Sequence, residues 1–238
     1  MVILEQNING KNVTAANDVT DMNNISSFDK NSLEYEEWFD KHPNIYQSEI
    51  LALKKAIPKN KKGIEIGSGT GRFSFPFKIN IGVEPSPKMS KHAEQKGMTI
   101  INACAENLPF HNHSFDFALM VTTVCFLNDI PKAFLEVHRI LKPKGKFIIG
   151  LIDRNSELGK KYEKEKIKNK FYRGAYFHST EDIIELLSGA GFTSFSFWQS
   201  LINPQTNKVE VPQRGYKKGS FIIIKSNKKK EIKMETTI

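Results

Sequence analysis

A glycine-rich turn and a single acid stand out among the residues that could do chemistry. Residues 63–71 read Gly-Ile-Glu-Ile-Gly-Ser-Gly-Thr-Gly, and Glu84 ends the next apolar stretch. Gly67, Gly69 and Gly71 let the backbone bend sharply and approach a ligand closely, because no Cβ is in the way. A helix that opens after them points free N–H groups at the bound molecule, and an acid at the tip of the next strand suits the two hydroxyls of a ribose. This order of features predicts a pocket for a nucleoside cofactor.

The spacing of the glycines differs from that of two common phosphate-binding motifs. A dinucleotide fingerprint, G-x-G-x-x-G, would place its third glycine at position 72, which is Arg72. A P-loop would end in Gly-Lys-Ser/Thr, and the sequence has no such ending here. The pattern is G-x-G-x-G, which a plain turn also produces. The prediction therefore depends on the strands and the acid that accompany the glycines.

Two histidines and two cysteines are the other candidates for chemistry. His111 and His113 stand two apart with no matching cluster, which is poor ligand geometry for zinc, so no metal site is predicted. Cys104 and Cys125 are interpreted as packed side chains, and so low a cysteine content fits a reducing compartment. The N-terminus has no basic leader, and no apolar run is long enough to cross a bilayer. We expect a cytoplasmic protein.

The net charge of +9 is concentrated in lysine-rich stretches. One covers residues 160–170, where Glu163 and Glu165 are interleaved, and the other covers residues 225–233. A basic balance can indicate a nucleic-acid partner. A solvated helix face and an exposed tail explain the same lysines without one. We therefore expect neither nucleic acid nor membrane as a partner, and no pattern indicates an oligomeric state.

The elements that must position these residues alternate between strand and helix. Apolar stretches predict seven strands, at residues 63–66, 79–84, 99–103, 115–122, 146–152, 192–198 and 220–225. Ser86 followed by Pro87, and Ser179 with Asp182 three residues later, are typical of helix starts. Alternating βα units predict an α/β fold with a doubly wound, mostly parallel sheet. No helix separates the last two strands, which predicts an antiparallel edge.

The ends of the chain differ in composition from this core. Residues 1–28 are rich in Asn, Thr and Asp, so we expect them to be disordered. Clustered aromatic and apolar residues at 29–58 predict an N-terminal helical cap. The core then covers residues 59–226, and residues 227–238 are expected to form a basic, flexible tail. A chain of 238 residues is long enough to bury a sizeable core in one large domain.

Five short motifs give the chain a resemblance to a known family. In order, they are residues 65–73 (Glu-Ile-Gly-Ser-Gly-Thr-Gly-Arg-Phe), 82–86 (Gly-Val-Glu-Pro-Ser), 105–110 (Ala-Glu-Asn-Leu-Pro-Phe), 114–116 (Ser-Phe-Asp) and 138–145 (His-Arg-Ile-Leu-Lys-Pro-Lys-Gly). With this set, the chain resembles the class I S-adenosylmethionine-dependent methyltransferases of the type 11 group over roughly residues 60–225. The resemblance implies a Rossmann-like methyltransferase fold, an enzyme, and S-adenosyl-L-methionine as the cofactor.

The resemblance also implies which residues hold the cofactor. They are Glu65, Gly67, Ser68, Gly69 and Gly71 around the methionine moiety, Glu84 and Pro85 at the ribose, Ala105 and Glu106 at the adenine, and Thr122 under the sulfonium. Glu65 would position the glycine loop or meet the amino group through water. Many family members have an acid directly before the Ala-Glu pair, where this chain has Cys104. Backbone contacts would then have to recognise the adenine amino group.

The implied reaction is an in-line displacement at the methyl carbon, for which the protein mainly aligns the acceptor and excludes water. A general base is needed only if the acceptor carries a proton that must leave. Candidates for the acceptor pocket lie in the cap or after strand ends: Tyr35, Trp38, His42, Tyr46, Thr123, Phe126, Asp153 and His178. Each could instead be a packing or capping residue. If two of the cap rings face the pocket, they can hold an amine by cation–π attraction.

Three functions are compatible with this sequence. The first is a methyltransferase that acts on a small-molecule N, O or S acceptor. The second is a tRNA or rRNA methyltransferase, but Val121-Thr122-Thr123-Val124 stands where base-amino methylation typically uses Asn/Asp-Pro-Pro followed by an aromatic residue. The third is a cofactor-binding protein of the same fold without turnover. The first is favoured, and the acceptor itself is not encoded in any motif.

Overall fold

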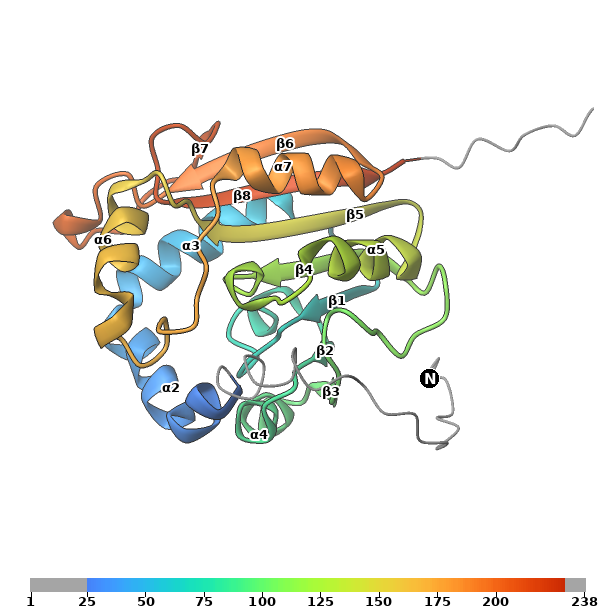
Figure 1. Ribbon diagram of the computed structural model, residues 1–238, viewed down its shortest axis with the longest axis horizontal. Coiled ribbons are helices and arrows are strands. Elements are labelled where there is room, and N and C mark those ends of the chain that lie inside the picture. Colours follow the sequence, from blue (N-terminus) through green and yellow to red (C-terminus); the bar gives the residue numbers. More distant parts are fainter. Residues whose placement is uncertain (1–24, 230–238) are drawn as a thin grey trace, which may run out of the picture.

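One sheet of eight strands runs through residues 25–229, the part of the chain that the computed structural model describes (Figure 1). The strand order is β3-β2-β1-β4-β5-β8-β6-β7. The strands are β1 (Gly63–Ile66), β2 (Ile81–Val83), β3 (Thr99–Ile101), β4 (Phe115–Val121), β5 (Leu141–Ile152), β6 (Phe192–Ser200), β7 (Gln213–Arg214) and β8 (Phe221–Lys228). The predicted α/β fold with a doubly wound sheet is confirmed.

The sheet is parallel in its first part and antiparallel at its far edge. β1 pairs in parallel with β2 and β4, and the parallel pairs β2–β3 and β4–β5 extend it on either side. β8 runs antiparallel between β5 and β6, and β6 also pairs with β7. The chain therefore changes winding direction between β1 and β4, and in open α/β sheets ligands bind at the strand ends beside such a switch.

The count of seven predicted strands was wrong by one short element. β7 consists of Gln213 and Arg214 alone, and both residues are exposed. A two-residue polar strand carries no alternation of apolar and polar side chains, so no sequence period could reveal it. The other strands match the predicted ones within three residues at each end, except that β5 begins at Leu141, five residues earlier than predicted.

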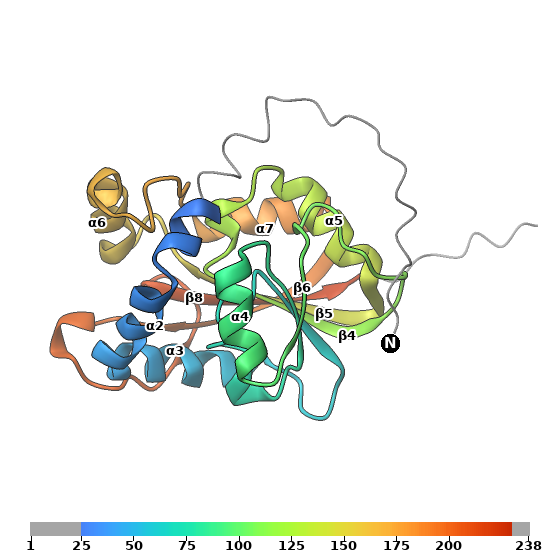
Figure 2. The same ribbon diagram turned by 90° about the horizontal axis from the view of Figure 1, so that it is seen from below.

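Helices cover both faces of the sheet (Figure 2). They are α2 (Ser32–Lys41), α3 (Pro43–Ala56), α4 (Pro87–Gln95), α5 (Ile130–Ile140), α6 (Glu157–Glu165) and α7 (Thr180–Gly189). Short 3-10 turns lie at Phe75–Phe77, Val124–Phe126, Lys166–Lys168 and Pro204–Thr206. α5 and α7 pack on one face with one hydrophobic core, and α2 and α3 belong to the core of the other face. None of the helices in the described range has the length and apolar character needed to cross a membrane.

The predicted helix starts are present as hydrogen-bonded caps. Ser86 accepts a hydrogen bond from the Met89 backbone N–H at the start of α4. Ser179 and Asp182 form a reciprocal capping box at α7: the hydroxyl accepts from the Asp182 N–H at 3.1 Å and the carboxylate accepts from the Ser179 N–H at 3.0 Å. Such caps satisfy N–H groups that the first turn of a helix leaves unpaired.

Both ends of the folded region extend further than the sequence predicted. Residues 25–30 are helical, although the composition predicted disorder up to residue 28, and residues 1–24 lie outside the described residues. The reason is Phe28, whose ring packs against Tyr35 and Phe126. At the other end β8 continues to Lys228, which is buried, so only the part of the expected tail from residue 230 lies outside the described range.

Candidate active site

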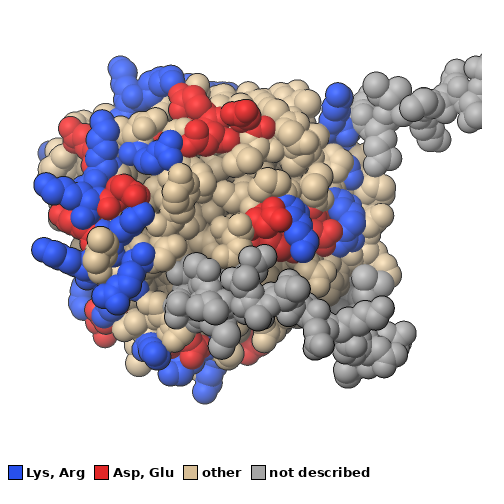
Figure 3. Space-filling view, in the orientation of Figure 1, with Lys and Arg blue, Asp and Glu red and all other residues tan. Residues whose placement is uncertain are grey.

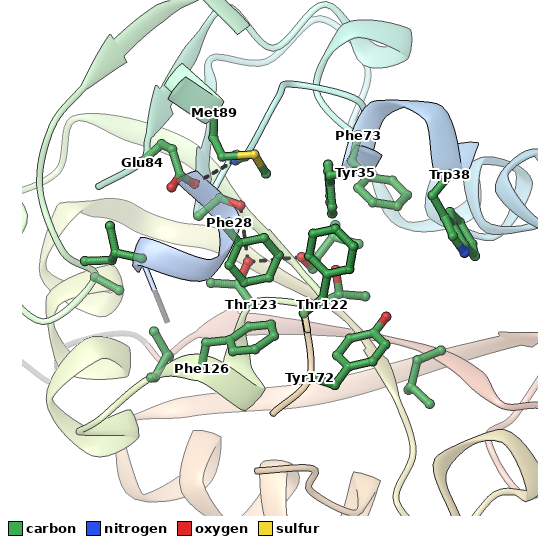
Figure 4. A pocket seen from close by; sticks show the side chains of 18 of the residues that line it. Phe28, Tyr35, Trp38, Phe73, Glu84, Met89, Thr122, Thr123, Phe126 and Tyr172 are labelled. Atoms are coloured by element: carbon green, nitrogen blue, oxygen red, sulfur yellow. Dashed lines mark hydrogen bonds between the residues drawn. The ribbon is translucent and has the colours of Figure 1, made fainter. Parts of the chain in front are cut away.

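A cavity of about 350 Å³ opens at the carboxyl ends of the parallel strands. These strands end on the side of the molecule where α2 and α6 lie (Figure 1). Its walls come from the glycine loop after β1, the ends of β2 and β4, the cap helices, and the segment that follows β5. The volume is in the range of small-molecule sites. Figure 4 places Glu84 and Met89 on one side of the cavity and Phe126 and Tyr172 on the other.

The glycine loop has the backbone conformation that its sequence predicted. Gly67, Gly69 and Gly71 have φ angles of +69°, +54° and +79°, a region that side chains with a Cβ rarely adopt. A Cβ on Gly67 would lie 2.3 Å from Cγ2 of Thr123. The Thr123 hydroxyl donates a hydrogen bond to the Gly67 carbonyl at 3.2 Å, which joins the ends of β1 and β4. The bare backbone of Gly67 and Gly69 forms part of the cavity wall.

Glu84 is a buried carboxylate that faces the cavity from the end of β2. Its Oε2 accepts from the Gly69 backbone N–H at 2.8 Å and its Oε1 from the Ser86 N–H at 2.9 Å. Burial raises the pKa of Glu84 above its usual value, and the two backbone hydrogen bonds oppose that rise. A carboxylate has about four acceptor positions, so each oxygen retains capacity for a ligand hydroxyl.

Three of the predicted cofactor residues lie behind the cavity wall instead of in it. Glu65 is fully covered and accepts a hydrogen bond from the Ser74 hydroxyl, and burial raises its pKa to about 8. The Ser68 side chain packs against Gly82, and Gly71 packs against Met98. These residues shape the loop from beneath. By contrast, Pro85, Ala105, Glu106 and Thr122 are all in the wall, as are Gly67, Gly69 and Glu84.

Thr122 carries backbone strain at the end of β4. Its φ is +49°, although it is a β-branched residue, and such conformations cost about 1–3 kcal/mol and concentrate at functional sites. The Thr122 N–H donates to the Gly150 carbonyl at 2.8 Å, which holds the bend. The strain turns the chain so that both Thr122 and Thr123 border the cavity. Glu106, another residue of the wall, accepts from the Asn128 backbone N–H at 3.1 Å.

Aromatic rings close the other half of the cavity. The Phe28 ring meets Phe126 edge-on with 5.1 Å between ring centroids, and it meets Tyr35 at 5.9 Å. Tyr172 stacks on Phe126 at 6.5 Å and on Tyr162 at 4.8 Å. Of the predicted acceptor residues, the structure brings Tyr35, Trp38, Thr123 and Phe126 together in this wall. Phe28, Tyr162 and Tyr172 were not predicted.

The cap contributes two further predicted residues that do not reach the cavity. His42 stacks on Trp38 and its Nδ1 lies 2.8 Å from the Trp38 carbonyl oxygen. The Tyr46 hydroxyl donates to the Arg72 carbonyl at 2.6 Å. Both side chains therefore hold the cap in place, and neither is among the residues that line the cavity.

Asp153 and His178 also lie outside the main cavity. The Asp153 carboxylate accepts from the Thr180 N–H at 2.9 Å and from the Asn155 N–H at 2.7 Å, so it fixes the start of α7. His178 borders a separate small hollow behind Thr122, and burial lowers the pKa of its imidazole. The position of Asp153 after a parallel strand suggested chemistry, but its hydrogen bonds are those of a helix cap.

Two residues of the site gave no clear signal in the sequence. Arg72 was noted in the sequence only because it stands where a dinucleotide fingerprint would have glycine. It pairs with Glu36 and Asp40 of α2, each at 3.0 Å, and thereby connects the cap to the glycine loop. Glu49 is a carboxylate on α3 that is only 5% exposed and borders the cavity. Its only signal was its place in an apolar helix, directly before Ile50 and Leu51. Within residues 25–229, no group of three possible metal ligands comes together.

Comparisons with known proteins agree with this geometry. The family model described as "Methyltransferase domain" (Methyltransf_11) matches residues 64–149. An uncharacterized protein of Methanocaldococcus jannaschii is 47% identical over 206 residues, which covers 86% of this chain and all of that protein.

Solved structures agree as well. A crystal structure from Thermotoga maritima, described as an SAM-dependent methyltransferase and possible histamine N-methyltransferase, is 45% identical with a TM-score of 0.83, over 86% of this chain and 99% of that one. The Haemonchus contortus phosphoethanolamine N-methyltransferase 2, solved in complex with S-adenosyl-L-methionine, shares the fold at 18% identity and a TM-score of 0.56, over 76% of this chain and 52% of that one.

Proposed function

The chain belongs to the S-adenosylmethionine-dependent methyltransferases, and from this premise we propose that it methylates a small molecule at a nitrogen, oxygen or sulfur atom. The single observation that carries the proposal is the shape of the site. One cavity runs from the glycine loop and Glu84 to an aromatic region around Phe126 and Tyr172. A cofactor at the first end leaves the second for an acceptor.

The residues at the first end fit S-adenosylmethionine. Gly67 and Gly69 present backbone without a Cβ, and the remaining acceptor positions of Glu84 suit the two ribose hydroxyls. Pro85 and Ala105 offer small apolar surface to the adenine. When bound, the cofactor supplies a methyl group on a positively charged sulfur, and the electron pair of the breaking S–C bond stays on that sulfur.

The remaining task of this chain is to orient the acceptor and exclude water. The Phe126 ring contacts both Phe28 and Tyr172, so this group of rings in the wall would hold an apolar body in a fixed position. Correct orientation of two reactants can supply roughly 7–11 kcal/mol of the barrier. The Thermotoga maritima relative is described as a possible histamine N-methyltransferase, which is a reason to keep nitrogen among the acceptors.

The charge distribution supports the small-molecule proposal over an RNA substrate. On the face drawn in Figure 3, basic side chains gather mainly at the edge that carries α6 and are mixed with acidic ones. Lys160, Lys161 and Lys164 of α6 are exposed, and Glu163 and Glu165 stand among them. This is the pattern of a solvated helix face.

The test is a methyl-transfer assay with radiolabelled S-adenosylmethionine and two extracts, one of metabolites below about 1 kDa and one of total RNA. We expect label in the small-molecule fraction and a strong loss of incorporation in Glu84→Ala. Label in RNA alone would replace this proposal with a nucleic-acid methyltransferase. Binding of S-adenosylhomocysteine without incorporation into either extract would favour a cofactor-binding protein without turnover.

A further inference from the structure

Glu49 places an acid in the wall of the cavity where the fold does not need one. It lies on the buried face of α3 with Ile45, one helical turn earlier, and both side chains border the cavity. Its side chain is 5% exposed. Burying a charge is costly unless it is paired and hydrogen-bonded, so a carboxylate at this position requires a compensating interaction.

The structure provides no such interaction from the protein itself. Within residues 25–229 no donor reaches the Glu49 carboxylate, and burial alone raises its pKa, to about 8. The other covered acids of the region all have donors: Ser74 for Glu65, Gly69 and Ser86 for Glu84. Glu49 is therefore a polar group aimed at the cavity with its hydrogen-bonding capacity unused.

The surroundings of Glu49 favour a positive charge. Tyr35 of α2, Tyr46 of its own helix, Tyr162 of α6 and Tyr172 of the segment after α6 lie within electrostatic range, and the Glu49 charge raises the pKa of each hydroxyl. Two of these rings, Tyr162 and Tyr172, stack at 4.8 Å. The faces of aromatic rings attract ammonium groups.

The charges of the wall all have one sign. Among its described residues the wall contains three acidic side chains, Glu49, Glu84 and Glu106, and no lysine, arginine or histidine. Glu84 and Glu106 accept hydrogen bonds from backbone N–H groups, which leaves Glu49 as the acid without a partner. An anionic acceptor, such as a carboxylate or a phosphate ester, would meet only like charge here.

Resting on the proposed function, we propose that the methyl acceptor is a small cationic amine and that Glu49 is its counter-ion. The ammonium group would bind the Glu49 carboxylate, with the faces of Tyr162 and Tyr172 beside it. Tyr35 lies within electrostatic range of both Glu49 and Glu84, so it connects this amine site to the cofactor end.

Proton balance gives the proposal a distinct signature. At pH 7 a free alkylamine carries its proton, and Glu49, with a pKa of about 8, also carries one. The complex keeps a single proton between nitrogen and carboxylate, whichever atom holds it. Binding at pH 7 therefore releases close to one proton to the solvent. The nitrogen lone pair becomes available for the methyl group when this remaining proton moves from the ammonium group to the Glu49 carboxylate, which then acts as the general base.

The experiment is calorimetry of the full chain saturated with S-adenosylhomocysteine. Phenethylamine and propylamine are each compared with the alcohol of the same shape, 2-phenylethanol and 1-propanol. We expect the wild type to bind at least one amine tenfold or more tightly than its alcohol. Proton release should appear as a difference between the binding enthalpies measured in phosphate and in Tris buffer. Glu49→Gln should lose the preference and the proton release. Glu37→Gln, an exposed acid of the same cap, should retain both.

The outcomes separate this proposal from the proposed function. If the wild type binds no S-adenosylhomocysteine, the proposed function fails, and the amine proposal with it. If it binds that compound but treats amines and alcohols alike, or if Glu49→Gln keeps the amine preference, only the amine proposal is overturned. A Glu49→Gln variant that loses affinity for S-adenosylhomocysteine would assign the carboxylate to the amino group of the cofactor and would also overturn it.

Discussion

The carboxylate of Glu84 accepts a hydrogen bond from the backbone N–H of Gly69, with 2.8 Å between the two atoms. The bond joins the end of β2 to the loop after β1, so the two features that the sequence singled out form one unit. Because Glu84 is held on the loop side, its free acceptor positions face the cavity. The shape of the loop and the proposed recognition of the ribose therefore depend on the same side chain.

Replacing Glu84 by Ala should weaken S-adenosylhomocysteine binding roughly 10- to 150-fold, the equivalent of about 1.5–3 kcal/mol for hydrogen bonds to a charged group. The loss has two sources, the missing ribose partner and the released Gly69 N–H. Calorimetry measures it directly. Glu94→Ala, an exposed acid on α4, is the control and should bind as the wild type does. Equal affinity in both variants would remove Glu84 from the cofactor site.

Gly67→Ala should destabilise the protein more than Gly97→Ala. Both glycines have positive φ, +69° and +87°, so both variants carry a backbone cost of about 1–2 kcal/mol. Only the Gly67 variant also drives a Cβ against Thr123, since a Cβ on Gly97 would meet nothing within 4 Å. Urea unfolding of the two variants gives the difference. Adding Thr123→Ala to Gly67→Ala should recover part of the lost stability. If no stability is recovered, contact with Thr123 is not the cause of the loss.

Asp153→Asn should reduce stability and leave S-adenosylhomocysteine affinity unchanged. The Asp153 carboxylate accepts from Thr180 and Asn155 around the start of α7, and weakening such buried hydrogen bonds costs about 1–3 kcal/mol. Thermal unfolding and calorimetry on the same samples separate the two effects. A variant that folds with wild-type stability but has lost methyl transfer would return Asp153 to the acceptor site, from which its hydrogen bonds exclude it.

Local sequence was sufficient to predict the shape of the glycine loop and the place of Glu84, because short-range rules act there. The positive φ angles of Gly67, Gly69 and Gly71 were implied by the residue type, and Glu84 follows directly from the end of its strand. The capping box at Ser179 is equally local. Each of these features involves residues a few positions apart, whose geometry the backbone alone restricts.

The acceptor end depended on contacts between distant parts of the chain, and local patterns could not reveal them. Tyr172 stacks on Phe126, 46 positions earlier in the sequence. Asp153 was a candidate for the acceptor pocket because it follows a strand. The structure shows instead that its carboxylate accepts a hydrogen bond from the N–H of Thr180, 27 positions away, at the start of a helix. Phe28 was assigned to a disordered segment on composition, but its ring finds partners in the cap and after β4. Tertiary packing decided all three cases.

The stability of the folded chain should depend on pH through Glu65. Burial raises the pKa of this carboxyl from 4.5 to about 8, so between those values the folded chain holds a proton that the unfolded chain has lost. Raising the pH through this window therefore favours unfolding, by up to about 1.4 kcal/mol per pH unit for each such group. Glu65→Gln keeps an acceptor for Ser74 and removes the titration. The unfolding free energy of this variant, measured in urea, should increase relative to that of the wild type as the pH rises from 5.5 to 8.

Glu49 contributes to the same slope, because its pKa is also raised to about 8 by burial. The double variant Glu49→Gln, Glu65→Gln should therefore have the flattest stability profile of the series, with each single variant between it and the wild type. Glu94→Gln, which removes an exposed carboxyl, should run parallel to the wild type. If the Glu65→Gln profile were also parallel, the folded chain would hold Glu65 ionised, and the buried Ser74 hydrogen bond would then have to stabilise a full charge.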